Sequence, residues 1–250
     1  MSRILVTNDD GIQSVGLAAL AEALRELGDV YVVAPLSEQS GAAHSLTLSR
    51  PLRIRQQAEF SWSVDGTPTD CVTLAINQIL PPELRPDVCV SGINYGANLG
   101  EDASYSGTVA GALEATIWGL PGVALSLATR RDFDFTEAAR FAVVAVRKVL
   151  AEGLPAGTLL NINIPPGPIK GARVTRQGVK MARPQITEQH DPRGKPYYWI
   201  GEQYFGRDGE DGTDFRAIID GYVSVTPLRS DLTDHQALSA LTAWHLEDIV

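Results

Sequence analysis

The chain has 250 residues, 44% hydrophobic and 20% charged, and its 30 Asp and Glu against 21 Lys and Arg give a formal net charge of −9. This composition is typical of a soluble globular protein with one sizeable core, or one core and an appendage. The absence of a basic run disfavours binding to a nucleic-acid duplex, whereas small anionic substrates stay open, because a metal ion or helix N-termini can reverse the charge locally.

The first predicted elements form a strand–helix–strand unit. A short apolar strand at residues 3–7 is followed by Ala and Leu at helical spacing over 14–27, and Gly28 ends this helix. The next apolar strand covers 30–34 and ends at Pro35. Such a unit implies a right-handed crossover and therefore a parallel sheet.

Helices and short apolar strands continue to alternate as far as residue 166. Extended segments are expected at 45–56 and 60–64, helices at 70–80, 108–118 and 136–151, and strands at 87–90, 123–126 and 159–164. This alternation predicts an α/β fold, namely a Rossmann-like three-layer α/β/α sandwich with a mostly parallel sheet.

The character of the chain changes after residue 166. Residues 172–205 contain β-type residues, turn formers and the aromatics Tyr197, Tyr198 and Trp199, without a helical pattern. We expect them to form extended β-hairpin arms that project from the body. Because an isolated pair of strands is only marginally stable, we expect the arms to pack on another subunit.

The end of the chain is expected to return to the body. A short helix near 214–220, a strand at 222–225 and a final helix at 236–244 are predicted there. The predicted division is therefore a Rossmann-like body at 1–166, hairpin oligomerisation arms at 167–210, and a C-terminal segment at 211–250 that returns to the body.

Cysteine usage and apolar runs bear on the compartment. Cys71 and Cys89 are too few and too far apart for a metal knuckle or a disulfide framework, and their apolar neighbours favour the core. The chain begins with a strand, without the charged leader and apolar segment of a signal peptide. No apolar run reaches the ~20 residues that a membrane helix needs. We therefore expect a cytoplasmic protein with no membrane attachment.

Two adjacent acidic residues, Asp9 and Asp10, follow the first strand. In an open α/β sheet, ligands bind beyond the carboxyl ends of the strands, where this pair is expected to lie. Neighbouring carboxylates repel, and capping a helix accounts for only one of them. A divalent cation satisfies both, and oxygen ligands favour Mg²⁺, Mn²⁺ or Ca²⁺ over zinc. A solvated turn is the alternative, since DDG is a common turn sequence.

Other polar segments are predicted to meet at the same sheet edge. SEQSGAAHS at 37–45 follows the second strand, and the amide-rich loop GINYGANLG at 92–100 follows a later one. Ser106, Gly107 and Thr108 then open a small-residue helix, whose free N–H groups and positive dipole end suit an anion. Ordinary N-capping is the alternative. Together with the acid pair, these segments suggest a metal-assisted phosphate site.

These motifs, in this order and spacing, give the chain a resemblance to the SurE family of survival-protein nucleotidases that runs nearly from end to end. The matching segments are ILVTNDDGI (4–12), SGAAHSLT (40–47), GTPTDCV (66–72), SGINYGANLG (91–100), YSGTVAGALEA (105–115), LNINIP (160–165), GTDFRAIIDGYVSVTPL (212–228) and DLTDH (231–235).

The resemblance implies a metal-dependent 5′-nucleotidase that hydrolyses nucleoside 5′-monophosphates to nucleoside and phosphate, with 3′-nucleotides and short polyphosphate as further substrates. It implies a homodimer with exchanged arms, in some members a homotetramer, and one divalent ion per subunit, Mg²⁺ or Mn²⁺, with Ca²⁺ also able to occupy the site. It places metal ligands at Asp9, Asp10, Ser40 and Asn94, catalytic roles at Asp9 and Asn94, and phosphate binding at Asn98, Ser106, Gly107 and Thr108.

Several alternatives stay open. Attack by water and a covalent aspartyl intermediate are both compatible with the sequence. A phosphatase of the aspartyl-nucleophile type is disfavoured because Asp9 and Asp10 are adjacent rather than separated by one residue. A non-catalytic nucleotide-binding module is disfavoured because TNDDGIQS lacks the G-x-G-x-x-G loop. His44 is either an acid or a hydrogen-bonded structural residue.

Overall fold

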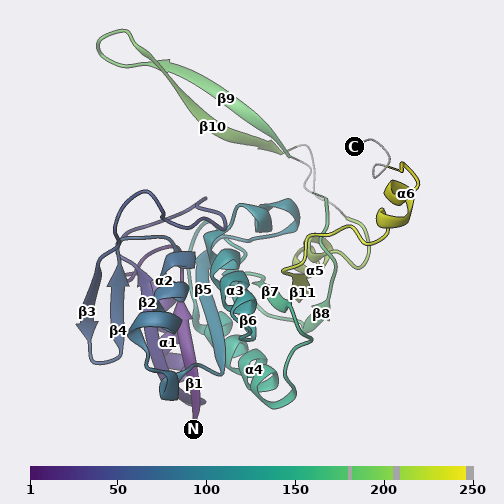
Figure 1. Cartoon of the computed structure of the whole chain (residues 1–250). Helices are drawn as coiled ribbons and strands as arrows, with labels where there is room; N and C mark the ends of the chain where they lie inside the picture. Colours follow the sequence, from purple (N-terminus) through teal and green to yellow (C-terminus); the bar gives the residue numbers. More distant parts are fainter. Residues whose placement is uncertain (180–181, 205–208, 246–250) are drawn as a thin grey trace.

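Nine strands form the central sheet of the computed structural model, which describes residues 1–179, 182–204 and 209–245. Their bounds are β1 Ser2–Thr7, β2 Gly28–Pro35, β3 Ile54–Ala58, β4 Ser61–Val64, β5 Val88–Tyr95, β6 Gly122–Leu127, β7 Thr158–Ile164, β8 Ala172–Val174 and β11 Val223–Arg229. Across the sheet they follow the order β3-β4-β2-β1-β5-β6-β7-β11-β8 (Figure 1). The pairs from β4 to β7 are parallel, and β3 and β11 run antiparallel to their neighbours β4 and β7.

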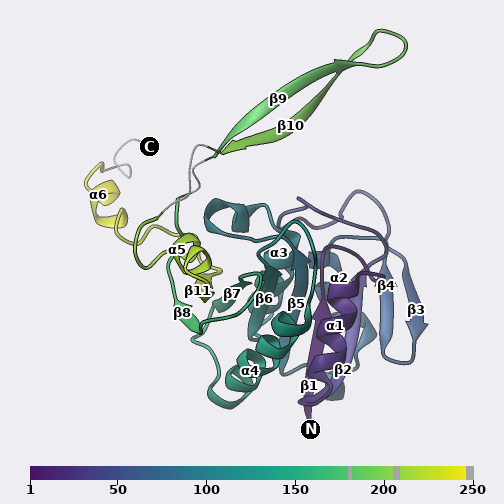
Figure 2. The same ribbon diagram turned by 180° about the vertical axis from the view of Figure 1, so that it is seen from behind.

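Helices cover both faces of this sheet (Figures 1 and 2). α1 (Val15–Leu24) and α4 (Thr136–Glu152) pack together on one face, and α2 (Pro68–Leu74) and α3 (Gly107–Ile117) on the other. The remaining helices are η1 Ala75–Ile79, η2 Pro82–Leu84, η3 Gly100–Ser104, α5 Asp214–Ile219 and α6 Leu238–Thr242. The predicted three-layer α/β/α sandwich is confirmed. In the part of the chain that the structure describes, no helix has the length and apolar character needed to cross a membrane.

Side chains of β1 alternate between the two apolar layers. Ile4 and Val6 lie in the core beneath α1 and α4, whereas Leu5 packs on the opposite face with residues of α2. All three are fully buried, which stabilises the fold by roughly 1.5–3 kcal/mol each. Continuing the alternation past the end of the strand points Asp9 toward the face that carries α3.

The chain changes direction across the sheet at β1. From β1 it crosses to β2 on one side, and it later returns to β5 on the other side of β1. The segments that leave the carboxyl ends of β1 and β5 therefore diverge, and such a switch point opens the crevice in which α/β proteins bind ligands. Asp9 and Asp10 follow β1 after Asn8, at this switch point.

β5 is longer than predicted, because the polar, Gly-rich segment after residue 90 continues as strand up to Tyr95. Its register with β6 shifts between Ser91 and Asn94, which marks a bulge. Gly92 lies inside the bulge at φ 140°, where a Cβ atom would lie 2.4 Å from a backbone oxygen of β6. Glycine and asparagine are typical of loops, so the sequence pattern hid the last residues of this strand.

One hairpin projects from the body (Figure 1). Its strands, β9 (Ala182–His190) and β10 (Pro196–Tyr204), pair antiparallel to each other in a separate two-stranded sheet. The projecting C-terminal hairpin is therefore confirmed. Residues 172–174, predicted to belong to the arms, instead form β8 at the edge of the main sheet, where they pair with β11. Thr175, Arg176 and Gly178 also bond to the body, so the projecting hairpin consists of β9 and β10.

Candidate functional site

The turn after β1 carries the adjacent acids. Asn8 shapes this turn, because its side chain accepts a hydrogen bond from the Gly11 N–H at 3.2 Å and donates one to the Gly11 carbonyl at 3.0 Å. Asp9 is 4% exposed, and Asp10 is partly buried. Asn8 is thus a turn residue that fixes the backbone from which both carboxylates extend.

The N-terminus of α3 lies directly against Asp9. Thr108 Oγ1 donates a hydrogen bond to Asp9 Oδ1. At Gly107, a Cβ atom would lie 2.7 Å from Asp9 Cβ and 2.9 Å from Asp9 Oδ2, so the approach requires glycine. Ser106 caps the helix, accepting from the Val109 N–H at 3.1 Å, which is the ordinary capping role considered for it. Two of the residues predicted to bind phosphate therefore contact a predicted metal ligand.

Burial raises the pKa of both carboxyls. For Asp9 the burial outweighs hydrogen bonds, chiefly from Thr108, that lower its pKa. Burial and the neighbouring Asp9 charge raise the pKa of Asp10 to about 7, with Glu38 adding to the shift and the Tyr95 N–H opposing it. Asp10 Oδ2 is buried and has no hydrogen-bond partner among the described residues. The pair therefore favours a proton or a cation.

Ser40 and Asn94 approach the acid pair through their neighbours in the chain. Gln39, adjacent to Ser40, donates its main-chain N–H to the Asp9 carbonyl at 2.7 Å. Tyr95, adjacent to Asn94, donates its main-chain N–H to the carboxylate of Asp10. The loop after β2 and the end of β5 are thus both brought to the turn that carries the acids.

The contacts of these two side chains leave oxygen atoms for a cation. Ser40 Oγ donates its proton to Glu38 Oε1 at 2.7 Å, and Asn94 Nδ2 donates to the Gly96 carbonyl at 3.0 Å. Among the described residues, no group of three or more His, Cys, Asp and Glu side chains is placed to hold a metal. Two carboxylates with neutral hydroxyl and amide oxygens suit Mg²⁺ or Mn²⁺. The donor set therefore fits a hard divalent cation.

Asn98 is held by β6 and β7. Its Nδ2 donates to Ser126 Oγ at 2.8 Å, and its main-chain N–H donates to Asn163 Oδ1 at 2.8 Å. Asn161 Nδ2 donates to the Asn98 carbonyl at 2.7 Å. These three partners were not among the predicted site residues. The segment LNINIP (160–165) is recognisable in the sequence only as a family motif and a strand, because a strand pattern does not show which residues its polar side chains contact.

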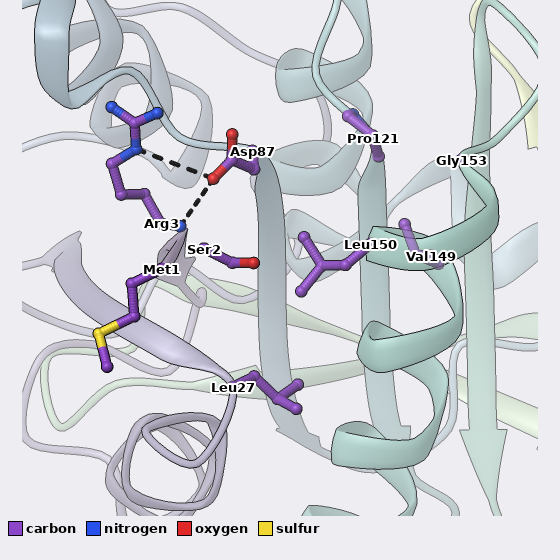
Figure 3. A pocket seen from close by; sticks show the side chains of 9 residues that line it. All are labelled: Met1, Ser2, Arg3, Leu27, Asp87, Pro121, Val149, Leu150 and Gly153. Carbon is purple, nitrogen blue, oxygen red and sulfur yellow. Dashed lines mark hydrogen bonds and ion pairs between the residues drawn. The ribbon is translucent and has the colours of Figure 1, made fainter.

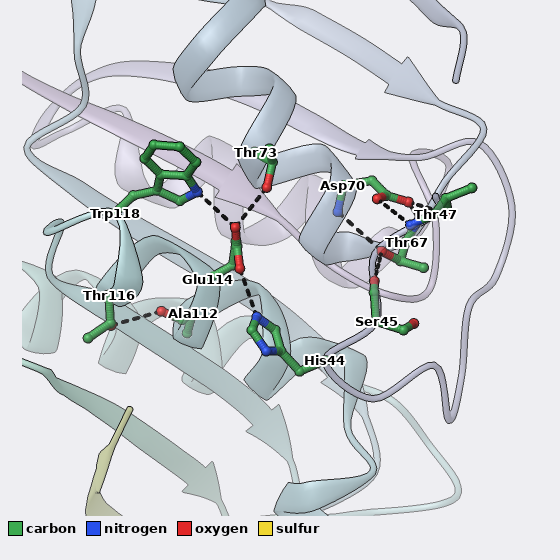
Figure 4. A network of polar contacts seen from close by, with 10 residues as sticks. All are labelled: His44, Ser45, Thr47, Thr67, Asp70, Thr73, Ala112, Glu114, Thr116 and Trp118. Atoms are coloured by element: carbon green, nitrogen blue, oxygen red, sulfur yellow. Dashed lines mark hydrogen bonds and ion pairs between the residues drawn. The ribbon is translucent and has the colours of Figure 1, made fainter. Parts of the chain in front are cut away.

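A third buried carboxylate, Glu114 of α3, holds the loop that carries Ser40 (Figure 4). His44 Nε2 lies 2.8 Å from Glu114 Oε2, and Thr73 Oγ1 and Trp118 Nε1 each donate to Oε1 at 2.8 Å. Burial acts to raise the pKa of Glu114, but the hydrogen bonds from His44, Thr73 and Trp118 prevail and lower it. Glu114 was missed, although it is the only charged residue in α3. His44 thus has a structural hydrogen bond.

The same loop is tied to α2 by Asp70 (Figure 4). Asp70 and Thr67 form a capping box at the start of α2, as expected for an acid in this position. Thr47 donates to the two Asp70 oxygens through its N–H at 2.9 Å and its hydroxyl at 2.6 Å. Thr67 Oγ1 donates to the Ser45 carbonyl at 2.7 Å. The part of the loop that follows Ser40 is therefore anchored to both α2 and α3.

An open pocket of about 650 Å³ lies at the opposite, amino-terminal ends of β1 and β5 (Figure 3). Arg3 and Asp87 contact each other there, with their closest side-chain atoms 3.8 Å apart, and Leu27 and Leu150 supply apolar walls. Asp87 is the only acid among the described residues that line this pocket, and it is already paired with Arg3. The acid pair at the carboxyl ends of the strands is therefore the better candidate for the functional site.

Comparisons with known proteins show which family the chain resembles. The family described as "Survival protein SurE" matches residues 4–184. A protein of Pelobacter propionicus named 5′-nucleotidase SurE is 51% identical over 96% of this chain and 98% of its own. One of Aquifex aeolicus with the same name is 48% identical over 99% of each chain. The crystal structure of the SurE protein from Aquifex aeolicus superposes with a TM-score of 0.87 at 48% identity, covering 97% of this chain and 99% of that one.

Proposed function

The chain belongs to the SurE family, and on this premise we propose that it is a metal-dependent 5′-nucleotidase that converts nucleoside 5′-monophosphates to nucleoside and inorganic phosphate. The observation that carries the proposal is the pair of buried Asp9 and partly buried Asp10 beside the N-terminus of α3. Asp10 Oδ2 has no hydrogen-bond partner among the described residues. The relatives named 5′-nucleotidase support the reaction class.

Four residues would hold the ion, Mg²⁺ or Mn²⁺ with Ca²⁺ as a substitute, at one site per subunit: Asp9, Asp10, Ser40 and Asn94. When bound, such an ion neutralises charge on the phosphoryl oxygens and lowers the pKa of a coordinated water. Hydrogen bonding supports the assignment, because the Ser40 and Asn94 protons are directed to Glu38 and Gly96.

The residues of α3 and its preceding loop would hold the phosphate. The positive dipole end of α3 favours an anion, and the main-chain N–H groups of Gly107 and Thr108 in its first turn also form hydrogen bonds with Asp9. Thr108 also donates to Asp9 and so orients that carboxylate. Ser106 and Asn98 would supply further donors. In this arrangement the catalytic role of Asp9 and Asn94 would be to hold the ion.

Attack by water is favoured over a covalent aspartyl intermediate. Asp9 is 4% exposed, and its Oδ1 already accepts a hydrogen bond from Thr108. Such a carboxylate is placed to hold a cation rather than to reach an incoming phosphorus atom. Failure to trap a phosphorylated protein after rapid quenching of turnover would agree with this mechanism, and a phosphorylated Asp9 or Asp10 would overturn it.

Phosphate release tests the function directly. AMP and GMP are expected to release phosphate with Mn²⁺ or Mg²⁺ and to release none after a chelator is added. Parallel assays with 3′-AMP and short polyphosphate measure how far the specificity extends. Equal turnover of AMP before and after chelation would contradict metal dependence, and no turnover of any nucleotide would contradict the nucleotidase assignment.

We also propose that the hairpin joins two copies of the chain into a homodimer, which can pair further into a homotetramer. The support is its exposed apolar side chains, which would be buried by a partner: Ile186 (57% exposed), Tyr198 (57%), Trp199 (64%) and Ile200 (80%). A short Gly-Ser linker can replace residues 182–204, because Ala182 and Tyr204 pair at the base of the hairpin. The replacement removes the proposed contact between subunits and is expected to reduce the mass measured by light scattering. An unchanged mass in a folded variant would contradict the intersubunit role.

A cytoplasmic location is part of the proposal. Cys71 and Cys89 are both free and buried, which suits a compartment that keeps thiols reduced. Burial raises the pKa of the Cys89 thiol to about 12 and that of Cys71 well above its usual range, so neither is a reactive nucleophile. Fractionation of cells that produce the chain would test the location.

A further inference from the structure

Two asparagine side chains are fully buried in β7. Asn161 and Asn163 alternate with Ile162 and Ile164, which pack in the core on the α1 and α4 side. The asparagines therefore face the opposite side of the sheet, which also carries α3. Asparagine is unfavourable in a central strand, and a buried amide destabilises a core unless hydrogen bonds satisfy it. The hydrogen-bond partners of Asn161 and Asn163 can therefore explain why asparagine occupies these two buried positions.

Both asparagines bond to the main chain of Asn98. Asn163 Oδ1 accepts the Asn98 N–H at 2.8 Å, and Asn163 Nδ2 donates to the Asn98 carbonyl at 3.2 Å. Asn161 Nδ2 donates to the same carbonyl at 2.7 Å. One amide side chain thus pairs with an N–H and a C=O of the same residue, as a neighbouring strand would. The backbone of Asn98 is fixed from one side by β7.

Ser126 of β6 fixes the side chain of Asn98. Its Oγ accepts one N–H of Asn98 Nδ2 at 2.8 Å, and both residues are buried. Ser126 pairs in register with Asn163 of β7 and, on its other side, with Asn94 of β5. A single row across the sheet therefore links a predicted metal ligand to the residues that hold Asn98.

The hydrogen bonds to β6 and β7 leave one side-chain N–H group of Asn98 unused. Its main-chain N–H and C=O and one side-chain N–H are occupied by β6 and β7. A primary amide has two N–H groups, so one donor of the side chain is not used by these contacts. Because rotation of the amide would break the bond to Ser126, the direction of that remaining N–H is set by the strands.

We propose that Asn161, Asn163 and Ser126 are positioning residues for the substrate's phosphate: they hold Asn98 so that its remaining side-chain N–H donates to a phosphoryl oxygen. This proposal deepens the proposed function and rests on it, because the role of Asn98 in binding phosphate is itself part of the proposed function. Asn161 Oδ1 has no hydrogen-bond partner among the described residues, so β7 keeps an amide that packing alone would not favour.

The test compares Ser126→Ala and Asn163→Leu with Thr226→Val. Ser126→Ala removes the hydrogen bond to the side chain of Asn98, and Asn163→Leu removes the hydrogen bonds to its main chain. The control removes another buried hydrogen bond, between Thr175 Oγ1 and Thr226 Oγ1 at 2.7 Å, without touching Asn98. We expect KM for AMP, and the Kd for inorganic phosphate measured by calorimetry on Mn²⁺-loaded protein, to rise about threefold in Ser126→Ala and at least about tenfold in Asn163→Leu. Thr226→Val should leave both unchanged.

A double variant separates positioning from general damage. If Ser126 acts through Asn98, Ser126→Ala should have no further effect on KM or phosphate affinity in an Asn98→Ala background. Affinity for Mn²⁺ should stay within about twofold throughout, since none of these residues is a proposed metal ligand. The inference would be overturned if Ser126→Ala and a folded Asn163→Leu kept the wild-type KM and phosphate affinity. It would also be overturned if Ser126→Ala raised KM as much in the Asn98→Ala background as in the wild type. A wild-type chain that cleaves no nucleotide would instead overturn the proposed function.

Discussion

Replacing Asp10 with Asn is expected to lower phosphate release from AMP by at least roughly a hundredfold while leaving the fold intact. A group that stabilises transition-state charge has an effect of this size, and here the charge would be held through the bound ion. The introduced amide keeps the shape of the side chain but cannot neutralise a dication. Single-turnover assays at saturating Mn²⁺, with circular dichroism as a check of folding, measure the loss. Full activity in the variant would refute the ligand assignment.

The same substitution is expected to stabilise the metal-free chain near neutral pH. The folded-state pKa of Asp10 is about 7, whereas an unfolded Asp titrates near ~3.9, so folding retains a proton that the unfolded chain releases. The metal-free wild type therefore loses stability as the pH rises from about 4 through 7. With chelator present, the Tm of Asp10→Asn should exceed that of the wild type at about pH 8 by more than at about pH 5.

A matched control removes one negative charge elsewhere. Asp29 is exposed near the start of β2, at the far end of the sheet from the acid pair. Asp29→Asn should keep full activity and should follow the wild-type pH profile of Tm. If Asp10→Asn and Asp29→Asn change the profile equally, net charge rather than the acid pair governs the pH dependence.

Gly107→Ala is expected to lower kcat/KM by at least roughly tenfold, the second large effect. The added Cβ would lie 2.7 Å from Asp9 Cβ, so either Asp9 or the N-terminus of α3 has to move. Movement of Asp9 weakens the ion site, and movement of the helix shifts the N–H groups proposed to bind phosphate. Calorimetry with Mn²⁺ and with inorganic phosphate distinguishes the two displacements.

Gly111→Ala is the control for this substitution. One turn further along α3, its Cβ would lie 2.9 Å from Thr7 Cγ2 and 3.0 Å from Ser91 Oγ, which are not site residues. It should lower Tm, because the helix is displaced from β1 and β5, but should change kcat/KM by no more than about threefold. An equal loss of activity in both variants would show that the collision with Asp9 has no specific role.

Much of the fold could be predicted because its signals are local. The strand at 3–7 and the helix at 14–27 come from apolar spacing and Gly28, and both appear as β1 and α1 with similar bounds. Asp9 and Asp10 stand out in the sequence because two adjacent charges at the end of a buried strand need a neutralising partner. The structure places that pair at the switch point of the sheet.

The rest depends on contacts between residues far apart in the chain. Nothing local shows that Glu114 bonds to His44, 70 positions away, or that Asn163 bonds to Asn98, 65 positions away. The bulge in β5 and the placement of β8 beside β11 likewise depend on neighbouring strands. Sequence patterns reveal where polar residues are unusual, and only the tertiary structure supplies their partners.

Titration calorimetry of Mn²⁺ into the metal-free chain tests the central claim that Asp9 and Asp10 together hold a divalent cation. We expect about one ion per chain at about pH 8, with affinity roughly tenfold weaker for each pH unit below 7, because the ion displaces the proton of a carboxyl whose pKa is about 7. Asp10→Asn should abolish the heat of binding. No binding to the wild type at saturating Mn²⁺, or unchanged binding to the variant, would contradict the account.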